Sequence, residues 1–320
     1  MAAEAKEHVD QVPATLGHPR VWQFWVAVVL TGLGTGIGAV LLSLILATTQ
    51  NSIWPGSSHT DLLDAVTQAS AWHRVLALTA AGVVTAIGQF ALTRLTSGNG
   101  IEITAAIWFE AGRLPSVRTL GSAILSIVIV GMGASLGREG APKQVGAVVA
   151  NLLATPATLS DEQRRLLVAC GAGAGMAAAY GVPLGGALFA LEVLRGALAL
   201  RLVLPALVTS LIATGVSWVT LPSSPTYTIP VSQWSASVVV WSLLAGCIMG
   251  VLSVAFVRAI AWADHIRPAG PARLIAPVLA LGLLGLASIA YPQLLGNGKD
   301  IAQLAFNGEL ASSLLIALWC

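Results

Sequence analysis

A glutamate inside a glycine-rich segment is the residue of this sequence best suited to do chemistry. Glu139 lies in GMGASLGREGAP, residues 131–142, between two apolar stretches. An ionisable side chain in such surroundings is costly, which favours a functional role. The glycines predict that one helix ends before Arg138 and that another begins there, so free N–H groups and the helix dipole would attract an anion. Ionised Glu139 would occupy that position, and protonated or displaced Glu139 would leave it open. The alternative is that Arg138 and Glu139 form an ion pair that only caps the helix.

The composition places this segment in a membrane protein. Of the 320 residues, 56% are hydrophobic and 9% are charged, whereas a typical soluble domain has about 25% charged residues. The mean hydropathy is +0.82, which excludes a water-soluble globular domain and a disordered chain. A polytopic helical membrane protein is therefore expected.

Charge and motif content exclude further function classes. The 16 basic and 14 acidic residues form no basic block, so no nucleic-acid partner is expected. The three cysteines, Cys170, Cys247 and Cys320, lack metal-ligand spacing, and we expect no metal and no cofactor. H-E-x-x-H and P-loop motifs are absent and no histidine is placed as a catalytic base, which argues against an enzyme.

The apolar stretches predict both long and broken helices. Six stretches are long enough to cross a bilayer core of about 30 Å: residues 21–49, 72–95, 116–136, 199–220, 234–263 and 272–291. Shorter pieces interrupted by glycine or proline lie at 100–111, 138–155, 163–179, 183–195 and 301–320. Such pieces predict discontinuous helices that build a site near the middle of the membrane. Membrane-boundary anchors are expected at Trp22, Trp25, Trp54, Trp72 and Trp234.

Lysine and arginine predict the orientation of the chain. They occur in the polar tail of residues 1–20, in 92–118 and in 258–273, whereas 50–71 and 221–233 have none. Because cytoplasmic segments carry the excess of basic residues, the N-terminal tail is expected in the cytoplasm. The tail lacks the pattern of a signal peptide.

Two sequence matches in the same order predict an internal repeat. GNGIEITAAIW (98–108) resembles GNGKDIAQLAF (296–306), and residues 34–47 resemble 246–259. The charge pattern puts the two GNG motifs on opposite sides of the membrane, which is typical of an inverted-topology repeat.

The repeat predicts the division of the chain. A cytoplasmic tail would take residues 1–20, a first transmembrane repeat with the Glu139 segment 21–220, and a partial second inverted repeat 221–320. By repeat symmetry roughly 110 residues would complete the second repeat, so we expect the sequence to be truncated at its C-terminus.

Three motifs resemble those of the CLC family of chloride channels and proton-coupled anion antiporters. GREGAP (137–142) looks like the family's G-K/R-E-G-P signature, and AGAGMAAAYGVPLGGALFALEVLR (172–195) is similar to its next characteristic stretch. GNGIE (98–102) lies where the family has G-S-G-I-P. The resemblance implies an all-α polytopic fold with inverted repeats and broken helices, in a bacterial inner membrane. It also implies a homodimer formed by the segments around 183–220.

The resemblance assigns roles to individual residues. Glu139 would be the external gating glutamate, and glycines beside it would shape the helix start that presents N–H groups to the anion. Asn99 would replace the serine that coordinates the central anion, because its amide can also donate; the alternative is a turn residue between glycines. The expected anion-binding residues are Asn99, Gly98, Gly100, Gly137, Arg138 and Gly140.

Three departures from the family pattern leave the substrate and the coupling open. Glu102 stands where proline is usual and Asn99 where serine is usual, so chloride, nitrate and fluoride are all candidate anions. Val193 takes the position of the antiporters' internal proton glutamate, which favours channel-like or weakly coupled flux; a one-residue shift would put Glu192 there. The family's G-x-F-x-P segment and pore tyrosine would lie beyond Cys320.

Four hypotheses are compatible with these residues. The first, which we favour, is transmembrane anion transport gated by Glu139 through pH or voltage. The others are a different inverted-repeat transporter in which Glu139 binds a proton or cation, an intramembrane enzyme, and a non-transporting fragment of a CLC protein. In the favoured mechanism anions pass helix N-termini, with no fixed cation to hold them too tightly.

Overall fold

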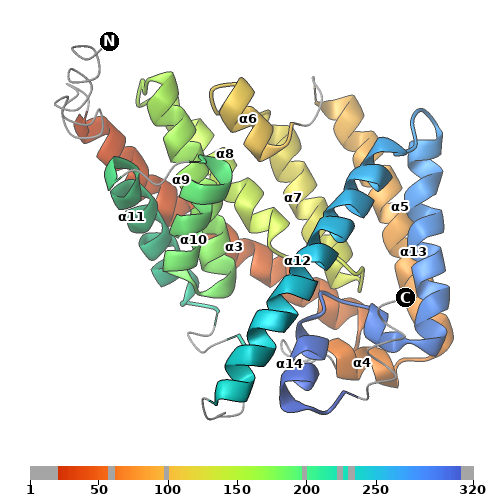
Figure 1. Ribbon diagram of the computed structural model, residues 1–320. Helices are drawn as coiled ribbons and strands as arrows, with labels where there is room; N and C mark the ends of the chain where they lie inside the picture. The colour runs from red at the N-terminus through yellow and green to blue at the C-terminus, as the bar shows by residue number, and fades with distance from the viewer. Residues whose placement is uncertain are drawn as a thin grey trace.

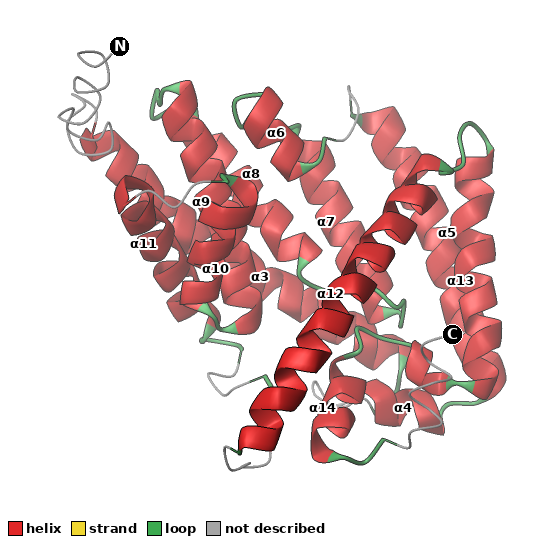
Figure 2. Ribbon diagram, viewed as in Figure 1, coloured by secondary structure: helices red, strands yellow, loops and turns green. Residues whose placement is uncertain are grey.

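The chain folds into helices, as the hydropathy pattern predicts. The computed structural model describes residues 21–56, 62–96, 101–196, 200–221, 226–229 and 235–310. Within these ranges every regular element is a helix (Figure 2), in agreement with an all-α membrane protein.

Long helices correspond to the six long apolar stretches. They are α3 (Val21–Ile53), α5 (Ala71–Leu95), α7 (Ser116–Gly131), α11 (Leu200–Ser217), α12 (Ala236–His265) and α13 (Ala272–Ala290). Four of them, α3, α5, α12 and α13, are long and apolar enough to cross a membrane. In Figure 1, α5 and α13 run side by side at one edge of the molecule.

Short helices fill the glycine- and proline-interrupted pieces. They are α4 (Leu62–Gln68), α6 (Ile103–Phe109), α8 (Gly140–Ala154), α9 (Asp161–Tyr180), α10 (Pro183–Phe189), the π-helix η1 (Ala190–Leu194), the 3₁₀-helix η2 (Pro292–Leu294) and α14 (Lys299–Asn307). The break between α9 and α10 has a physical cause, because Gly181 adopts a left-handed φ of 68° and Pro183 opens the next helix.

The end of α7 differs from the prediction. The apolar run predicts a helix to residue 136, but α7 ends at Gly131. Gly133 has a φ of 100°, which a helix does not allow. The connection from Gly131 to α8 is therefore longer than expected, and it carries the approach to Glu139.

Glycine contacts hold the helices around α8 together. A Cβ on Gly146 of α8 would lie 2.0 Å from the Gly171 carbonyl oxygen of α9, and one on Gly173 would lie 2.3 Å from the Gly186 carbonyl oxygen of α10. Lipid gives helices little hydrophobic reason to associate, so small residues that allow close backbone approach take that role. The beginning of α8 is thus fixed by packing further along the same helix.

The helix α12 has a different environment from α3, the helix that its sequence resembles. None of the residues of α12 is buried, and no atom of a neighbouring element lies within 4 Å of a Cβ built on Gly246 or Gly250. In α3 a Cβ on Gly38, which the sequence match pairs with Gly250, would lie 2.4 Å from Val145 of α8. Figure 1 shows α12 crossing one face of the molecule as a separate rod.

The tryptophan anchor predicted at residue 54 is wrong. Trp54 is only 1% exposed, and its ring contacts His73 edge-on with centroids 5.2 Å apart. His73 in turn lies 2.7 Å from the Ile53 carbonyl oxygen through Nε2. Trp54 is therefore part of the packing between α3 and α5 rather than a contact with the membrane surface.

Candidate functional site

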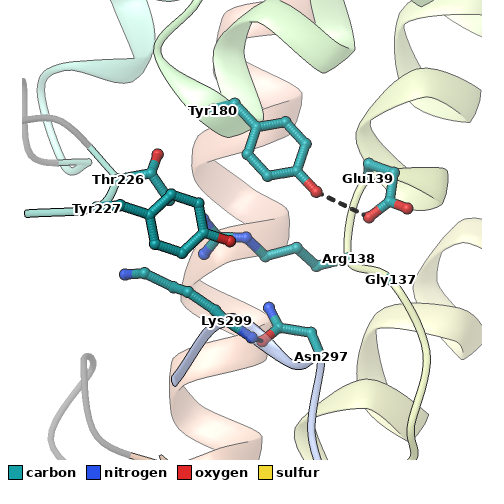
Figure 3. A pocket seen from close by; sticks show the side chains of 8 residues that line it. All are labelled: Gly137, Arg138, Glu139, Tyr180, Thr226, Tyr227, Asn297 and Lys299. Atoms are coloured by element: carbon teal, nitrogen blue, oxygen red, sulfur yellow. Dashed lines mark hydrogen bonds between the residues drawn. The ribbon is translucent and has the colours of Figure 1, made fainter. Parts of the chain in front are cut away.

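Glu139 lies at the N-terminal end of α8 without capping it. Its side chain makes no hydrogen bond to the first turn of the helix, and its Oε2 instead accepts a hydrogen bond of 3.0 Å from the Tyr180 hydroxyl at the end of α9 (Figure 3). The Gly140 and Ala141 N–H groups therefore have neither an intrahelical acceptor nor the Glu139 carboxylate. Pro142 has no N–H, and the Lys143 N–H donates to the Glu139 carbonyl oxygen at 3.3 Å. The helix start that would attract an anion is free of its own glutamate in this conformation.

Arg138 does not pair with Glu139. Its guanidinium extends away from the carboxylate (Figure 3), with Cζ 5.6 Å from the centroid of the Tyr180 ring. One of its N–H groups donates to the Ala179 carbonyl oxygen at 3.5 Å, a weak contact. The alternative of a neighbouring ion pair that only caps the helix therefore does not describe this arrangement.

Gly137 is required by the position of the Glu139 side chain. A Cβ at residue 137 would lie 2.1 Å from Glu139 Oε1, well inside van der Waals contact. A side chain at residue 137 would displace the Glu139 carboxylate from this position. At Gly140 a Cβ would meet no atom within 4 Å, so the two glycines of this motif differ in what they permit.

A small polar cavity, here the Tyr180 chamber, lies beside the Glu139–Tyr180 pair. Its volume is about 120 Å³. It brings together the start of α8, the end of α9, residues 226–227 and the start of α14 (Figure 3). The residues that line it are Gly137, Arg138, Glu139, Tyr180, Thr226, Tyr227, Asn297 and Lys299. A wider cavity of about 480 Å³, lined also by α3 and α11, shares with it four residues: Arg138, Tyr180, Thr226 and Lys299.

A second cavity with a mixed polar and apolar lining, the Lys143 chamber, contacts the same start of α8. Its volume is about 250 Å³, and α5, α6, α7 and α8 enclose it. The residues that line it are Gln89, Leu92, Ile101, Glu102, Ile103, Arg118, Thr119, Ser122, Gly140, Lys143 and Gln144. The three residues before α8 thus line one chamber, and Gly140, Lys143 and Gln144 line the other. Along the chain, Glu139 is the last of these residues to line the Tyr180 chamber, and Gly140 is the first to line the Lys143 chamber.

The charges of both chambers differ from one expectation. A passage without fixed cations was expected, yet the Tyr180 chamber is lined by Arg138 and Lys299 and the Lys143 chamber by Arg118 and Lys143. The sequence pattern gave no role to Tyr180 or Lys299. Their available signals were the position of Tyr180 directly before the Gly181 break and of Lys299 inside the second GNG motif.

Of the remaining predicted site residues, three fall outside the described ranges and one lines neither chamber. Gly98, Asn99 and Gly100 are outside the described residues. Val193 lies in the π-helix η1 with 56% of its surface exposed, and it lines neither chamber. Across the described ranges, no three side chains of the metal-ligating types come together.

Broken helices that bring a carboxylate to the side of a polar cavity are typical of helical membrane transporters. Comparison with known proteins makes this class specific. A sequence profile of the family described as voltage gated chloride channel matches residues 81–320. The chain is 31% identical over 255 residues to the voltage-gated ClC-type chloride channel ClcB of Escherichia coli, which covers 76% of this chain and 59% of that protein. The chain therefore belongs to the voltage gated chloride channel family.

Solved structures of low sequence identity share the fold. A slow cyanobacterial Cl⁻/H⁺ antiporter aligns with a TM-score of 0.73 and 21% identity over 95% of this chain and 71% of its own. A CLC-type fluoride/proton antiporter aligns with a TM-score of 0.69 and 19% identity over 92% of this chain and 72% of its own. These alignments confirm the predicted CLC-like fold. The chain spans 55–59% of the length of the curated relatives it matches.

Proposed function

We propose that this protein moves small monovalent anions across a membrane and that Glu139 is the gate of the path. The observation that carries the proposal is the position of the Glu139 carboxylate at the start of α8, where it lines the Tyr180 chamber with the basic side chains of Arg138 and Lys299. Family membership supports the same class of activity.

The mechanism follows from competition for the start of α8. The helix dipole and the N–H groups of the first turn favour a negative charge there. Ionised Glu139 is one such charge, tethered beside the site, and an incoming anion is the other. Tyr180 holds the carboxylate to one side by donating its hydroxyl proton. Protonation of Glu139 removes its charge, so the side chain no longer competes with the anion for the start of α8. Anion flux is therefore expected to rise as pH falls.

The choice of anion and the coupling belong to the same proposal. The names of similar proteins mention chloride and fluoride, and chloride, nitrate and fluoride are the candidate substrates here. We keep the anion-binding roles of Asn99, Gly98, Gly100, Gly137, Arg138 and Gly140 as part of the proposal. Valine at residue 193 cannot carry a proton, so proton coupling should be weak.

The setting of the protein is proposed on the same grounds. Four helices suited to crossing a membrane and bacterial relatives support a multi-pass protein of a bacterial inner membrane. The basic residues in the tail of residues 1–20 favour a cytoplasmic N-terminus. The lipid bilayer and a second copy of the chain are the expected partners.

Anion efflux from liposomes tests the gate. Glu139→Gln should give flux that no longer depends on pH and equals or exceeds the wild-type flux at its most acidic pH. The matched control is Glu110→Gln, which makes the same change at an exposed position outside both chambers and should keep the wild-type pH dependence. If Glu139→Gln keeps the wild-type pH dependence, the assignment of Glu139 as the gate is wrong. If the wild-type protein carries no anion flux, the proposed transport function is wrong.

The same liposomes test the coupling. A chloride gradient should drive little proton uptake through the wild-type protein, because the internal glutamate position holds Val193. Proton uptake in a fixed ratio to chloride efflux would contradict weak coupling while leaving anion transport intact.

A further inference from the structure

We propose that Gln303 is a positioning residue for the gate, because it fastens residues 226–229 to α14 and so holds Tyr227 as one wall of the Tyr180 chamber. This attachment is called the Gln303 strap below. The inference rests on the proposed function for its use in gating, but its evidence is the position of a chain segment and is independent of flux.

The Gln303 side chain pairs with both backbone groups of a single residue. Its Oε1 accepts a hydrogen bond of 2.9 Å from the Thr228 N–H, and its Nε2 donates one of 2.7 Å to the Thr228 carbonyl oxygen. The same Nε2 donates to Asn307 Oδ1 at 3.0 Å, which orients the amide. Within the described part of the chain, no other side chain hydrogen-bonds to residues 226–229. Gln303 therefore provides the polar attachment of this segment.

A ring contact reinforces the strap one residue away. The Tyr227 ring packs edge-on against Phe306, with centroids 5.3 Å apart, an arrangement that aromatic pairs favour. Because Gln303 and Phe306 lie three positions apart on α14, their side chains share one face of the helix. The segment is thus attached to that face through both its backbone and a side chain.

The helix α14 is itself anchored, so the strap has a fixed base. At the start of α4, the Leu63 N–H donates to Asp300 Oδ2 at 3.2 Å. Just before α14, the Gly296 N–H donates to the Gly133 carbonyl oxygen at 3.0 Å, in the connection between α7 and α8. That connection leads to the gate, so the strap ties the position of Tyr227 to the gate segment.

The strap determines what lies beside Glu139. Tyr227 and Glu139 both line the Tyr180 chamber, and the Tyr227 hydroxyl points towards the middle of the chamber (Figure 3). Tyr227 does not line the wider cavity of about 480 Å³, whereas Thr226 lines both cavities. Residues 226–227 therefore form part of the partition between the two cavities. Release of the strap should open this partition and let larger solutes reach Glu139.

The first GNG segment lacks the strap. Its match with the second segment places Ala105 at the position of Gln303, and the methyl side chain of alanine cannot hydrogen-bond. The polar side chain is therefore particular to the copy that borders the Tyr180 chamber.

Thiol labelling at the gate position tests the strap in the purified full chain in detergent. The reporter is Glu139→Cys, with Cys247 and Cys320 replaced by serine, because Cys247 is exposed whereas Cys170 is buried. The probe is a methanethiosulfonate that carries a sulfonate group, and the labelling rate reports how easily a solute reaches residue 139.

Loss of the strap should speed this labelling. Gln303→Met removes both hydrogen bonds to Thr228 and should raise the rate at least about tenfold, the effect expected from two neutral hydrogen bonds. Phe306→Leu loosens the same segment without a change at Gln303 and should also raise the rate. Gln23→Met is the matched control, since it makes the same change at an exposed position of α3 and should leave the rate unchanged. Co-elution with wild type on gel filtration checks that the variants fold.

A double variant distinguishes positioning of Tyr227 from general loosening. Tyr227→Ala removes the wall itself and should raise the labelling rate at least as much as Gln303→Met does. If Gln303 acts through Tyr227, Gln303→Met should change the rate of the Tyr227→Ala chain less than about twofold, because the effects of coupled residues do not add. A full tenfold increase in that chain would show that Gln303 does not act through Tyr227.

The outcomes separate this inference from the proposed function. Unchanged labelling in Gln303→Met and in Phe306→Leu overturns the strap, even if Glu139→Gln shows that Glu139 is the gate. Conversely, labelling that depends on Gln303 supports the strap even if the wild-type chain carries no flux, in which case only the transport proposal fails.

Discussion

At the scale of residues, the hydrogen bond between Tyr180 and Glu139 sets how easily the gate moves. The Tyr180 hydroxyl donates to Glu139 Oε2 and holds the carboxylate to one side of the start of α8. Tyr180→Phe removes the donor, and a hydrogen bond to a charged group contributes about 1.5–3 kcal/mol. The released carboxylate can occupy the start of α8, so we expect the anion flux of Tyr180→Phe at neutral pH to be roughly tenfold lower than that of wild type. Flux measured across a series of pH values would show this loss, which should disappear at acidic pH.

A second variant checks this prediction by another route. Gly137→Ala leaves Tyr180 in place but puts a methyl group where Glu139 Oε1 now lies, 2.1 Å from the new Cβ. The carboxylate must leave its present position beside Tyr180, so anion flux at neutral pH should fall as it does in Tyr180→Phe. If Tyr180→Phe and Gly137→Ala both keep the wild-type profile, the contact in Figure 3 does not control the gate.

The sequence predicted one half of this contact and not the other. Glu139 is recognisable because a charge beside glycine breaks in an apolar chain is unusual. Tyr180 is 41 positions away and reaches Glu139 only because α8 and α9 pack closely. Lys299 comes from still further along the chain, in a second copy of a motif whose first copy lacks lysine. A local sequence pattern can identify a residue such as Glu139, but the residues that contact it are known only from the tertiary packing.

At the scale of elements, the glycines of α8 and α9 determine where the gate segment lies. Gly146 and Gly171 contact each other through their backbones, and a Cβ on either would lie within 2.3 Å of the opposite carbonyl oxygen. Gly146→Ala must push the two helices apart, and overpacking of this kind costs about 1–3 kcal/mol or more. We expect a lower melting temperature in detergent and weaker pH gating together, because α8 carries Glu139 at its start.

A matched substitution isolates the packing effect. Gly246→Ala makes the same chemical change on α12, where the new methyl group meets no atom of a neighbouring element. Helix propensity favours alanine over glycine by about 1 kcal/mol, so this variant should be as stable as wild type or slightly more stable. Equal destabilisation by Gly146→Ala and Gly246→Ala would show that close helix contact is not the cause.

Element boundaries show where sequence reasoning succeeds and where it stops. Long apolar runs set the extents of α5 and α13 to within a residue or so, because hydropathy alone decides them. The end of α7 was missed by five residues, since residues 132–136 remain apolar while Gly133 takes a backbone conformation that no helix contains. Hydropathy indicates where an apolar segment lies in the sequence. The left-handed backbone conformation that ends a helix at a glycine is seen only in the folded chain.

At the scale of the whole molecule, we propose different surroundings for the exposed apolar faces of different helices. Those of α10 and α11 are proposed to meet a second copy of the chain, whereas α12 stands apart on another face (Figure 1). Leu204 and Leu211 on α11 are 52% and 53% exposed, and Leu243 and Ile248 on α12 are 68% and 58% exposed. Exposure alone therefore does not distinguish a dimer interface from a lipid-facing surface, and a paired substitution is needed.

Single-molecule photobleaching of labelled protein in liposomes makes that distinction. The wild-type protein should bleach mostly in two steps. Leu204→Gln with Leu211→Gln should shift the population towards one step, because each amide buried in an apolar interface without a partner costs about 1–3 kcal/mol. Leu243→Gln with Ile248→Gln places the same amides on α12 and should leave the two-step population unchanged. Two results would contradict dimerisation through the α11 face. They are one-step bleaching of the wild-type protein and an equal loss of two-step spots in both double variants. The reason is that the position of the amides affects the number of associated copies only if one of the two faces is the interface.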